Sequence, residues 1–382
     1  MTQTTETESR RAFRELLEIL AEIDVGYLSA ENGISEPADD ADGHRFLMHL
    51  LESAVTIAFE SDPDHPDLRR IVTPTRKALG DNPDAIYFEA PINPTRSYRM
   101  RGKLAGAVYT SITVEAGPAD GGYGTRTAGV INDTQFDVSA DGSYEITVGG
   151  PPQDRNWLDL PDDAARVTTR HYFEEPTPAA ADPLRFVPLT IESLDALPPP
   201  LPWNDQSIAA GIRRVTKYLR GRTIDRPPRD PAALPTWVGT IPNVFPQPQT
   251  PGDMSLSAFD AAYSSGPYAL GPEEALVITG RWPTCRFASV DLWNRFLQTY
   301  DYVHRPVGRN RANTILEPDG SFRMVLAHGD PEVPNWLDTE GRPAGQLFWR
   351  FFLPEGDIQT PQTKVVPFST IARGGHHADA PR

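Results

Sequence analysis

The sequence predicts a mainly β protein built from two tandem antiparallel β-sandwiches, with helices before the first sandwich and between the two. Three observations support this fold class. A long segment recurs about 180 residues further along the chain, short β-rich runs dominate both copies, and 39 prolines among 382 residues disfavour long helices. Because this period is several-fold longer than that of a solenoid unit, the repeat indicates a duplicated domain.

The repeat is defined by two short words. Asp-Gly-Ser at 141–143 and Asn-Trp-Leu-Asp at 156–159 return at 319–321 and 335–338. The glycine of each Asp-Gly-Ser supplies the positive φ that a tight hairpin needs, so each of these words is expected to join two strands.

Strand-forming runs surround these words. In the first copy, residues 108–114 alternate between two faces, and two further short runs are rich in β-branched and aromatic residues. In the first copy these two runs are 144–148 and 167–173. The corresponding runs of the second copy are 275–279, 287–292, 322–326 and 346–353. Since no β–α alternation accompanies them, an antiparallel sandwich is expected for each copy.

Three stretches have helical periodicity. Residues 9–23 and 43–59 each place apolar side chains on one stripe, which predicts an amino-terminal helical pair. A third helix, from about 204 to 220, begins at an Asn or Asp cap and ends before Gly221. The expected organisation is a helical segment (1–75), a first sandwich (76–185), a proline-rich connection with one helix (186–250), a second sandwich (251–370) and a flexible tail (371–382).

The repeated words also carry a family resemblance. The Asp-Gly-Ser turn, the Asn-Trp-Leu word and an arginine in the following aromatic run resemble a bacterial family catalogued as domain of unknown function 1214. The resemblance is stronger for residues 252–370 than for residues 81–176. It implies a jelly-roll-like β-sandwich, and it implies no activity, because the family has no established one.

Composition excludes several classes of partner. The formal net charge is −16, which disfavours nucleic acid and anionic membrane surfaces because both require basic patches. The amino terminus lacks the apolar core of a signal peptide, and no apolar run is long enough to span a bilayer. A cytoplasmic protein without nucleic acid or membrane partners is therefore expected.

No metal or cofactor is predicted. His44 and His49 are five residues apart, which is not the i, i+4 spacing of a zinc helix. The acidic segment 62–67 lacks the glycine and the terminal glutamate of a calcium loop and is expected to be a solvated loop. Cys285 has no helix start beside it, and the glycines at 121–124 are not followed by a strand-to-helix turn, so neither a nucleophile nor a nucleotide site is indicated.

Residues kept in both copies are expected to build the fold. The Asn-Trp pairs should close turns and fill the core, although a ligand platform of Trp336 and Asn335 is the alternative. Arg170 and Arg350 lie in apolar runs, where an unpaired charge is costly. We expect each to pair with a carboxylate, for example the aspartate of the preceding Asn-Trp-Leu-Asp.

Polar residues present in only one copy are free to serve a site, and they point to the second sandwich. Asp291, His304 and His328 could exchange protons, with Arg309 holding an anionic or carbonyl group. Aromatic residues crowd the same copy, and Phe348, Arg350 and Phe352 should face opposite to Trp349 and Phe351. One of these two faces must lie away from its own core. That face could cover the helices, the other sandwich or a ligand. The predicted site is catalytic Asp291, His304 and His328, with ligand contacts from Trp282, Trp293, Arg309, Asn335, Trp336 and Arg350.

Two function hypotheses follow. The first is a cofactor-independent acid–base enzyme, a lyase, isomerase or hydrolase, acting on a small organic molecule in an aromatic cleft of the second sandwich. The second is a non-catalytic protein that binds a small molecule such as a carbohydrate, terpenoid or steroid, or that assembles into a homo-oligomer. A duplicated β-sandwich fits both hypotheses, since fold does not fix function.

Overall fold

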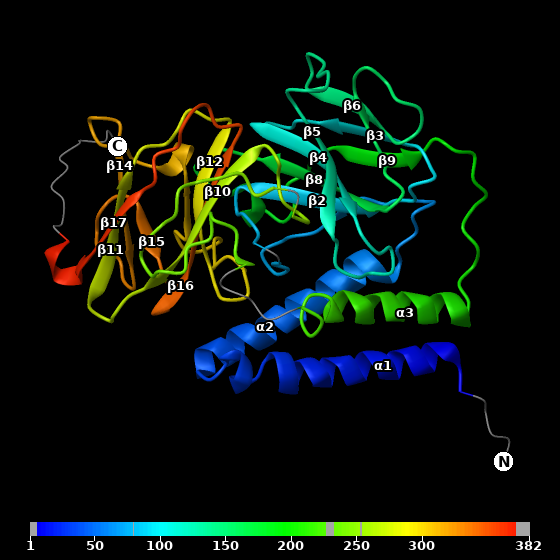
Figure 1. The fold of residues 1–382 in the computed structure, drawn as a ribbon, viewed down its shortest axis with the longest axis horizontal. Helices are drawn as coiled ribbons and strands as arrows, with labels where there is room; N and C mark the ends of the chain where they lie inside the picture. Colours follow the sequence, from blue (N-terminus) through cyan, green and yellow to red (C-terminus); the bar gives the residue numbers. More distant parts are fainter. Residues whose placement is uncertain (1–5, 79, 227–232, 253, 372–382) are drawn as a thin grey trace.

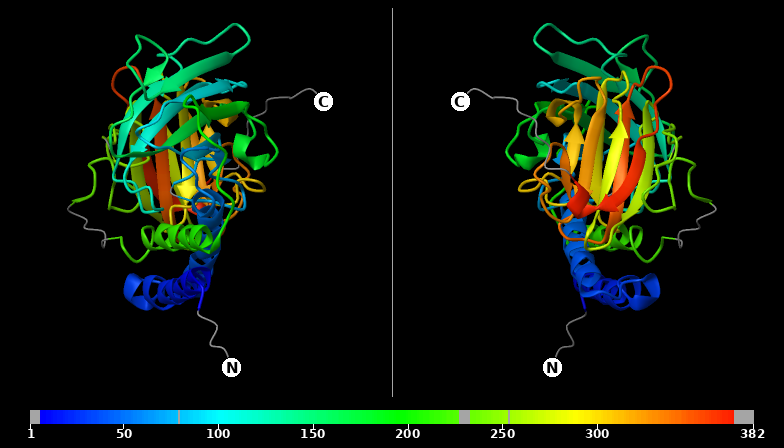
Figure 2. Two further views of the ribbon diagram at one scale, coloured as in Figure 1. Left: turned by 90° about the vertical axis from the view of Figure 1, so that its right-hand side faces the viewer. Right: turned by 90° about the vertical axis from the view of Figure 1, so that its left-hand side faces the viewer.

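The structure of the protein, a computed structural model, describes residues 6–78, 80–226, 233–252 and 254–371. Two β-sandwiches lie side by side along the long axis, and three α-helices run along one edge of the molecule (Figure 1). Both views along the long axis keep the helices at that same edge (Figure 2). This arrangement confirms the predicted fold class of tandem sandwiches with helical additions.

The first sandwich pairs a five-stranded sheet, in the order β1-β2-β8-β4-β5, with a four-stranded sheet, in the order β7-β6-β3-β9. Its strands are β1 (Arg69–Arg70), β2 (Ala85–Pro91), β3 (Tyr98–Lys103), β4 (Tyr109–Ala116), β5 (Arg126–Asn132), β6 (Ser143–Val148), β7 (Trp157–Leu158), β8 (Ala164–Tyr172) and β9 (Leu189–Ser193). Strand β9 follows a long connection from β8 and pairs with β3. The first sandwich therefore extends past its expected end at residue 185.

The second sandwich repeats this plan with sheets in the orders β10-β16-β12-β13 and β15-β14-β11-β17. Its strands are β10 (Ala261–Ala269), β11 (Glu274–Gly280), β12 (Phe287–Trp293), β13 (Gly308–Asn310), β14 (Phe322–Ala327), β15 (Trp336–Asp338), β16 (Ala344–Phe352) and β17 (Gln362–Pro367). With β1 set aside, the strand orders of the two sandwiches correspond one to one. The sequence repeat therefore marks a duplicated fold.

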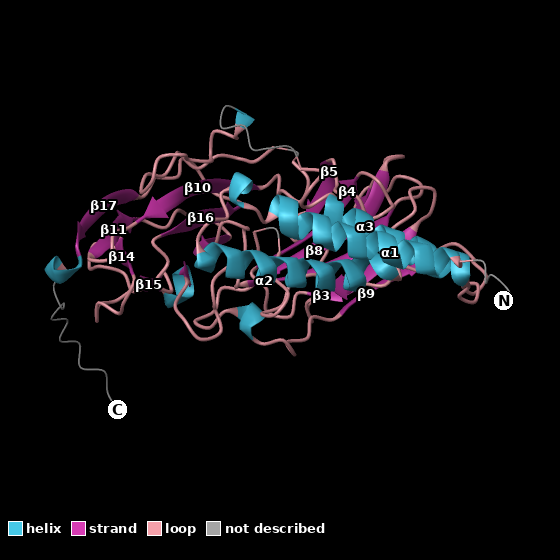
Figure 3. Cartoon of the chain, turned by 90° about the horizontal axis from the view of Figure 1, so that it is seen from below, coloured by secondary structure: helices cyan, strands magenta, loops and turns pink. Residues whose placement is uncertain are grey.

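Three α-helices appear where the periodicity predicts them. They are α1 (Glu8–Glu22), α2 (Pro37–Ala54) and α3 (Asp205–Arg220). Helix α2 starts earlier than expected, with Pro37 in its first turn, where the missing N–H of proline costs nothing. Shorter helical turns are η1 (Ile23–Tyr27), η2 (Ala30–Asn32), η3 (Val55–Phe59), η4 (Ala179–Ala181), η6 (Arg311–Asn313) and η7 (Phe368–Thr370). Seen from below, α1 and α3 lie together under the first sandwich and α2 reaches towards the second (Figure 3).

Two sheets face each other across the middle of the molecule, namely the five-stranded sheet of the first sandwich and the β10-β16-β12-β13 sheet of the second. Each of these facing sheets has one face in its own core and one face turned outward. In the second sandwich, Trp349 and Phe351 of β16 enter the core, whereas Phe348 and Phe352 point the other way. The predicted alternation of this strand is thus confirmed. The outward faces of the two facing sheets meet each other, so the first sandwich covers the aromatic face of the second copy.

The contact between the sandwiches is aromatic and nearly symmetric. Tyr109 stacks on Phe352 with ring centroids 4.2 Å apart, and Phe287 packs on Tyr172 at 4.8 Å. Strand registers make Tyr109 the counterpart of Phe287, and Tyr172 the counterpart of Phe352. The same contact therefore occurs twice with the partners exchanged, as a local two-fold axis requires.

Segments that lead into each sandwich cross over to the other one. Before β2, the Asn82 side chain donates to Asp291 Oδ2 of β12 at 2.7 Å. Before β10, the Leu256 N–H donates to Glu115 Oε2 of β4 at 3.0 Å. These exchanged arms fill the space where the two sheets diverge from the aromatic contact.

Helix α2 is fastened to the second sandwich through a buried histidine. His49 Nδ1 accepts the Lys77 N–H at 3.1 Å and the Gln298 side-chain amide at 3.2 Å. Burial lowers the pKa of His49 to about 4, so the ring is neutral near pH 7. Phe46 stacks on Phe296 beside it, with centroids 5.1 Å apart.

Removing an aromatic ring from the contact between the sandwiches should destabilise the whole protein. Phe352→Ala should lower the free energy of unfolding by about 3–5 kcal/mol, because the fully buried ring leaves a cavity that both sandwiches line. Urea denaturation measures this change. Phe186→Ala, at a ring that is 78% exposed, is the control and should change stability by less than about 0.5 kcal/mol. Equal effects from the two variants would contradict the proposed importance of the contact.

Stability should also fall in acid as His49 becomes protonated. The folded-state pKa of about 4 lies below the ordinary value of 6.5, so the folded protein binds fewer protons than the unfolded chain between these pH values. Stability contributed by neutral His49 is present above pH 6.5 and is lost as the pH falls towards 4. The loss between pH 7 and pH 4.5 should be smaller in His49→Gln by about 1–3 kcal/mol, as measured by urea denaturation. An unchanged pH profile in His49→Gln would contradict the assignment.

Candidate functional site

A cavity of about 260 Å³ lies between the helical layer and the outward face of the five-stranded sheet. Its position follows from the fold, because this end of the sheet extends beyond the contact with the second sandwich. The volume is close to the lower limit of about 300 Å³ for typical small-molecule pockets. Its lining residues are Ile57, Ala58, Ser61, Pro63, Arg69, Glu89, Pro91, Ile92, Pro118, Ala119, Gly121, Ala165, Arg166, Arg214 and Tyr218.

Two opposite charges form the polar part of the floor. Glu89 on β2 and Arg166 on β8 lie on neighbouring antiparallel strands, and each residue is only 8% exposed. Arg166 Nη1 is 3.9 Å from Glu89 Oε1, which is too far for a hydrogen bond. Arg166 Nη2 donates to the Gly122 carbonyl at 3.2 Å, and this bond fixes the guanidinium beside the cavity.

Two further arginines line the cavity and also cap the carboxyl end of the helical segment that continues α2. Arg214 donates to the Ala58 and Phe59 carbonyls, each at 2.8 Å. Arg69 donates to the Thr56 carbonyl at 2.6 Å. These carbonyls belong to the last turn after α2, where backbone acceptors lack helical partners and the helix dipole favours a positive charge.

The helical side of the cavity is aromatic and basic. Burial raises the pKa of Tyr218 above its ordinary value, so its hydroxyl stays protonated at neutral pH. Behind the tyrosine, the Arg222 guanidinium lies 3.3 Å from the centre of the Tyr218 ring, in a cation–π contact. Three lining arginines against one lining glutamate make the cavity positive, within a chain of net charge −16.

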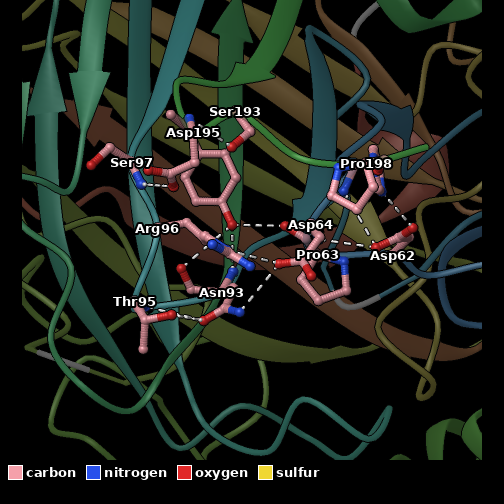
Figure 4. A network of polar contacts seen from close by, with 12 residues as sticks. Asp62, Pro63, Asp64, Asn93, Thr95, Arg96, Ser97, Ser193, Asp195 and Pro198 are labelled. Carbon is pink, nitrogen blue, oxygen red and sulfur yellow. Dashed lines mark hydrogen bonds and ion pairs between the residues drawn. The ribbon is translucent and has the colours of Figure 1, made fainter. Parts of the chain in front are cut away.

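A polar network holds the loop that forms one wall (Figure 4). The Tyr98 hydroxyl donates to the Pro63 carbonyl at 2.7 Å, and Arg96 Nε donates to Asp64 Oδ1 at 3.1 Å. That hydrogen bond from Arg96 lowers the pKa of Asp64. His65 bridges Asp62 and the Pro198 carbonyl at 3.0 and 2.9 Å. The acidic loop expected to be solvated is thus tied to the first sandwich and shapes the cavity.

The matching place in the second sandwich is neutral and closed. By strand register, Gln346 corresponds to Arg166 and Ser265 corresponds to Glu89. Gln346 Nε2 donates to Ser265 Oγ at 2.6 Å, so this pair satisfies itself. The Ser265 N–H also donates to the Trp237 carbonyl, which belongs to a segment lying over this part of the sheet.

The three residues expected to be catalytic lie apart. Asp291 is 1% exposed in the contact between the sandwiches, where burial raises its pKa well above the ordinary value. His304 has a 76% exposed side chain and pairs with Asp301 at 2.9 Å. His328 is half-buried at the end of β14 and bonds to Thr339 Oγ1 at 2.6 Å. No hydrogen bond among the described residues joins any two of the three, so the structure does not bring them together.

The residues expected to bind a ligand are divided among several environments. Trp282 packs on Phe322 at the edge of the second core, with ring centroids 5.0 Å apart. Trp293 is 4% exposed and donates to the Asp81 carbonyl at 2.9 Å. Arg309 donates to the Trp336 carbonyl at 2.8 Å. None of these contacts lines the cavity described above.

The two repeated arginines do not pair with the expected aspartates. Arg170 lies 3.8 Å from Glu115, and Asp338 pairs instead with Arg305 at 2.6 Å. Arg350 donates to the Gly80 carbonyl at 3.3 Å and lies over aromatic rings, including Phe348 at 4.9 Å. Both arginines point to the outward face of their sheet, whereas Asp338 lies on the opposite sheet of its sandwich.

Both Asn-Trp pairs make the same backbone contacts. Asn156 and Asn335 have positive φ angles of 53° and 57°. Their side-chain oxygens accept backbone N–H groups across the turn, in each case at 2.8 Å. Trp157 and Trp336 donate their indole N–H to the Gly149 and Ala327 carbonyls. The shared geometry favours the structural interpretation of these words.

The described residues contain no metal-binding cluster and no membrane-spanning helix. Among them, no group of three or more His, Cys, Asp or Glu side chains is arranged to hold a metal ion. None of the described helices combines the length and the apolar character needed to cross a bilayer.

One solved structure shares this fold. An uncharacterised protein from Burkholderia cenocepacia matches with a TM-score of 0.77 and 24% identity, over 95% of this chain and 97% of that chain. A protein from Vibrio parahaemolyticus matches with a TM-score of 0.47 and 12% identity, over 85% of this chain and 98% of that chain. No family model and no curated protein matches the sequence. The resemblance to domain of unknown function 1214 therefore stays a prediction.

Sequence comparison of the two copies could have found the floor of the cavity. Glu89 and Arg166 are charged residues whose counterparts, Ser265 and Gln346, are neutral. They satisfy the criterion that polar residues found in one copy are free to serve a site. The single-copy polar residues named from the sequence lie in the second copy, whereas Glu89 and Arg166 lie in the first.

Replacing Asn335 should separate the cost of its backbone conformation from the value of its hydrogen bonds. Asn335→Gly keeps a residue that tolerates positive φ but loses the side-chain bonds, so unfolding should become easier by about 1–2 kcal/mol. Asn335→Ala loses the same bonds and adds about 1 kcal/mol of left-handed strain. Thermal and urea denaturation measure both changes. Equal stability of the alanine and glycine variants would contradict the role assigned to the positive φ.

Proposed function

We propose that this protein binds a small organic molecule in the cavity between its helical layer and its first sandwich. The observation that carries the proposal is the nearly buried Glu89–Arg166 pair, whose charged atoms face the cavity without bonding each other. A nearly buried carboxylate that receives no hydrogen bond is costly, so a ligand that supplies a donor to Glu89 would be favoured at this place.

The remaining lining suits a molecule with an apolar body. Ile57, Pro91, Ile92 and Pro118 supply apolar surface, and Tyr218 adds an aromatic wall. Such a mixture of apolar walls and a few convergent polar groups is typical of small-molecule sites. The network around Asp64 holds one wall in place, which reduces the entropy that a ligand would have to overcome.

This proposal places the binding hypothesis at a different surface from the one expected. The acid–base enzyme hypothesis stays a prediction, as does assembly into a homo-oligomer. A binding function requires only groups that are complementary to the ligand. Acid–base catalysis also requires a proton donor and a proton acceptor beside the reacting atoms.

Blocking the cavity should abolish ligand binding without unfolding the protein. Ala119 is exposed at the rim, so Ala119→Trp should fill the entrance. Saturation-transfer NMR with benzyl alcohol, phenylacetate, mandelate and mandelamide should show bound signals for at least one compound in the parent protein and none in Ala119→Trp.

The matched control is Ala140→Trp, at an exposed turn of the first sandwich far along the chain from the lining residues. It should keep the bound signals. If no compound gives a signal with the parent protein, or if Ala119→Trp keeps the same signals as the control, the proposal is wrong.

A further inference from the structure

The spacing of the two charges on the cavity floor restricts the chemistry of the ligand, on the basis of the function proposed above. Glu89 offers acceptors only, and no described residue donates a hydrogen bond to its carboxylate. Arg166 offers donors only, and one of its terminal nitrogens is already bound to the Gly122 carbonyl. A complementary molecule therefore needs an anionic acceptor for Arg166 and a donor for Glu89.

The two complementary groups fit well when they are close together. Arg166 Nη1 and Glu89 Oε1 are 3.9 Å apart, so an acceptor and a donor carried on adjacent carbons of a ligand can bond to both charges at once. A carboxylate with a hydroxyl or ammonium group on the adjacent carbon has this arrangement. A carboxylate with a hydroxyl group across an aromatic ring does not.

The charge and the volume of the cavity restrict the class of ligand further. Arg69 and Arg214 add positive charge to the lining, which favours a carboxylate over a neutral amide. A cavity of about 260 Å³ exceeds the roughly 150 Å³ that holds one benzene ring, so a single-ring or short branched side chain fits. Apolar lining residues such as Ile57 and Ile92 would contact that side chain.

We infer that the cavity binds a 2-hydroxy or 2-amino carboxylic acid with an apolar side chain. Its carboxylate bonds to Arg166, and its hydroxyl or ammonium group donates to Glu89. The neutral Gln346–Ser265 pair at the matching place of the second sandwich lacks this recognition, because its two side chains bond each other at 2.6 Å.

The test compares three closely related single-ring compounds by calorimetry. Mandelate has both recognised groups, phenylacetate lacks the hydroxyl, and mandelamide lacks the anionic charge. On the parent protein, mandelate should bind at least about 10-fold more tightly than either relative, since a hydrogen bond to a charged group contributes about 1.5–3 kcal/mol. Phenylglycine in place of mandelate tests the ammonium form, and the tighter of the two identifies the donor.

A double variant supplies the matched control. Arg166→Gln combined with Glu89→Ser copies the pair that the second sandwich already accommodates, so the fold should persist, as circular dichroism and melting temperature would show. Selectivity among the three compounds should fall below about 3-fold in this variant. Retained selectivity in the double variant would overturn the inference.

Other outcomes separate this inference from the proposed function. Equal binding of mandelate, phenylacetate and mandelamide to the parent protein, blocked by Ala119→Trp, would overturn the inference and leave the cavity as a binding site. Absence of binding by every compound, phenylglycine included, would overturn both.

Discussion

The structure depends on the burial of two outward-facing sheet surfaces against each other. The five-stranded sheet of the first sandwich and the β10-β16-β12-β13 sheet of the second have apolar and aromatic side chains on both faces, so exposure of their outward faces to water would be unfavourable. The stacked rings of Tyr109 and Phe352, and of Phe287 and Tyr172, bury these faces in one nearly symmetric contact. The exchanged arms that carry Asn82 and Leu256 then close the space on either side. Once this contact forms, the orientation of the two sandwiches is fixed, and one end of the first sheet remains for the helices to cover.

That remaining end is where the two copies differ in chemistry. The second copy fills its equivalent place with a hydrogen-bonded Gln346–Ser265 pair under a covering segment, which leaves nothing for a ligand to bond. The first copy has Arg166 and Glu89 there, separated by 3.9 Å and nearly buried, under a helical layer that leaves a cavity. Duplication of a fold followed by divergence at one equivalent place is an economical route to a single site. One copy keeps the scaffold stable, and the other is free to hold charges that would weaken a core.

Most of the fold could be predicted from local patterns, whereas the site could not. Helices α1 and α3 begin at capping side chains and follow a clear apolar stripe, and the duplicated turns around Asn156 and Asn335 mark equivalent positions in the two sandwiches. The cavity, in contrast, combines the turn after α2, the loop that carries Pro63, strands β1, β2 and β8, a loop near residue 120, and helix α3. No motif joins residues from so many separate segments, because their proximity arises only when the helical layer packs on the sheet. Asp291, which the sequence predicts to be catalytic, lies in the contact between the sandwiches, as do Phe348 and Phe352 of the crowded aromatic set.

By itself the sequence determined the duplication, the strand-rich character of both copies, the three helices and the alternation that puts Phe348 and Phe352 on the face opposite to Trp349 and Phe351. These features depend on residues near each other in the chain, where period and turn chemistry are sufficient. Only the tertiary structure decided what covers each outward face. An aromatic strand is equally consistent with a ligand, a helix or another sheet, and the choice depends on the shape of the whole molecule. For the same reason the structure moved the candidate site from the second sandwich to the first, where the helical layer leaves Arg166 and Glu89 beside an open space.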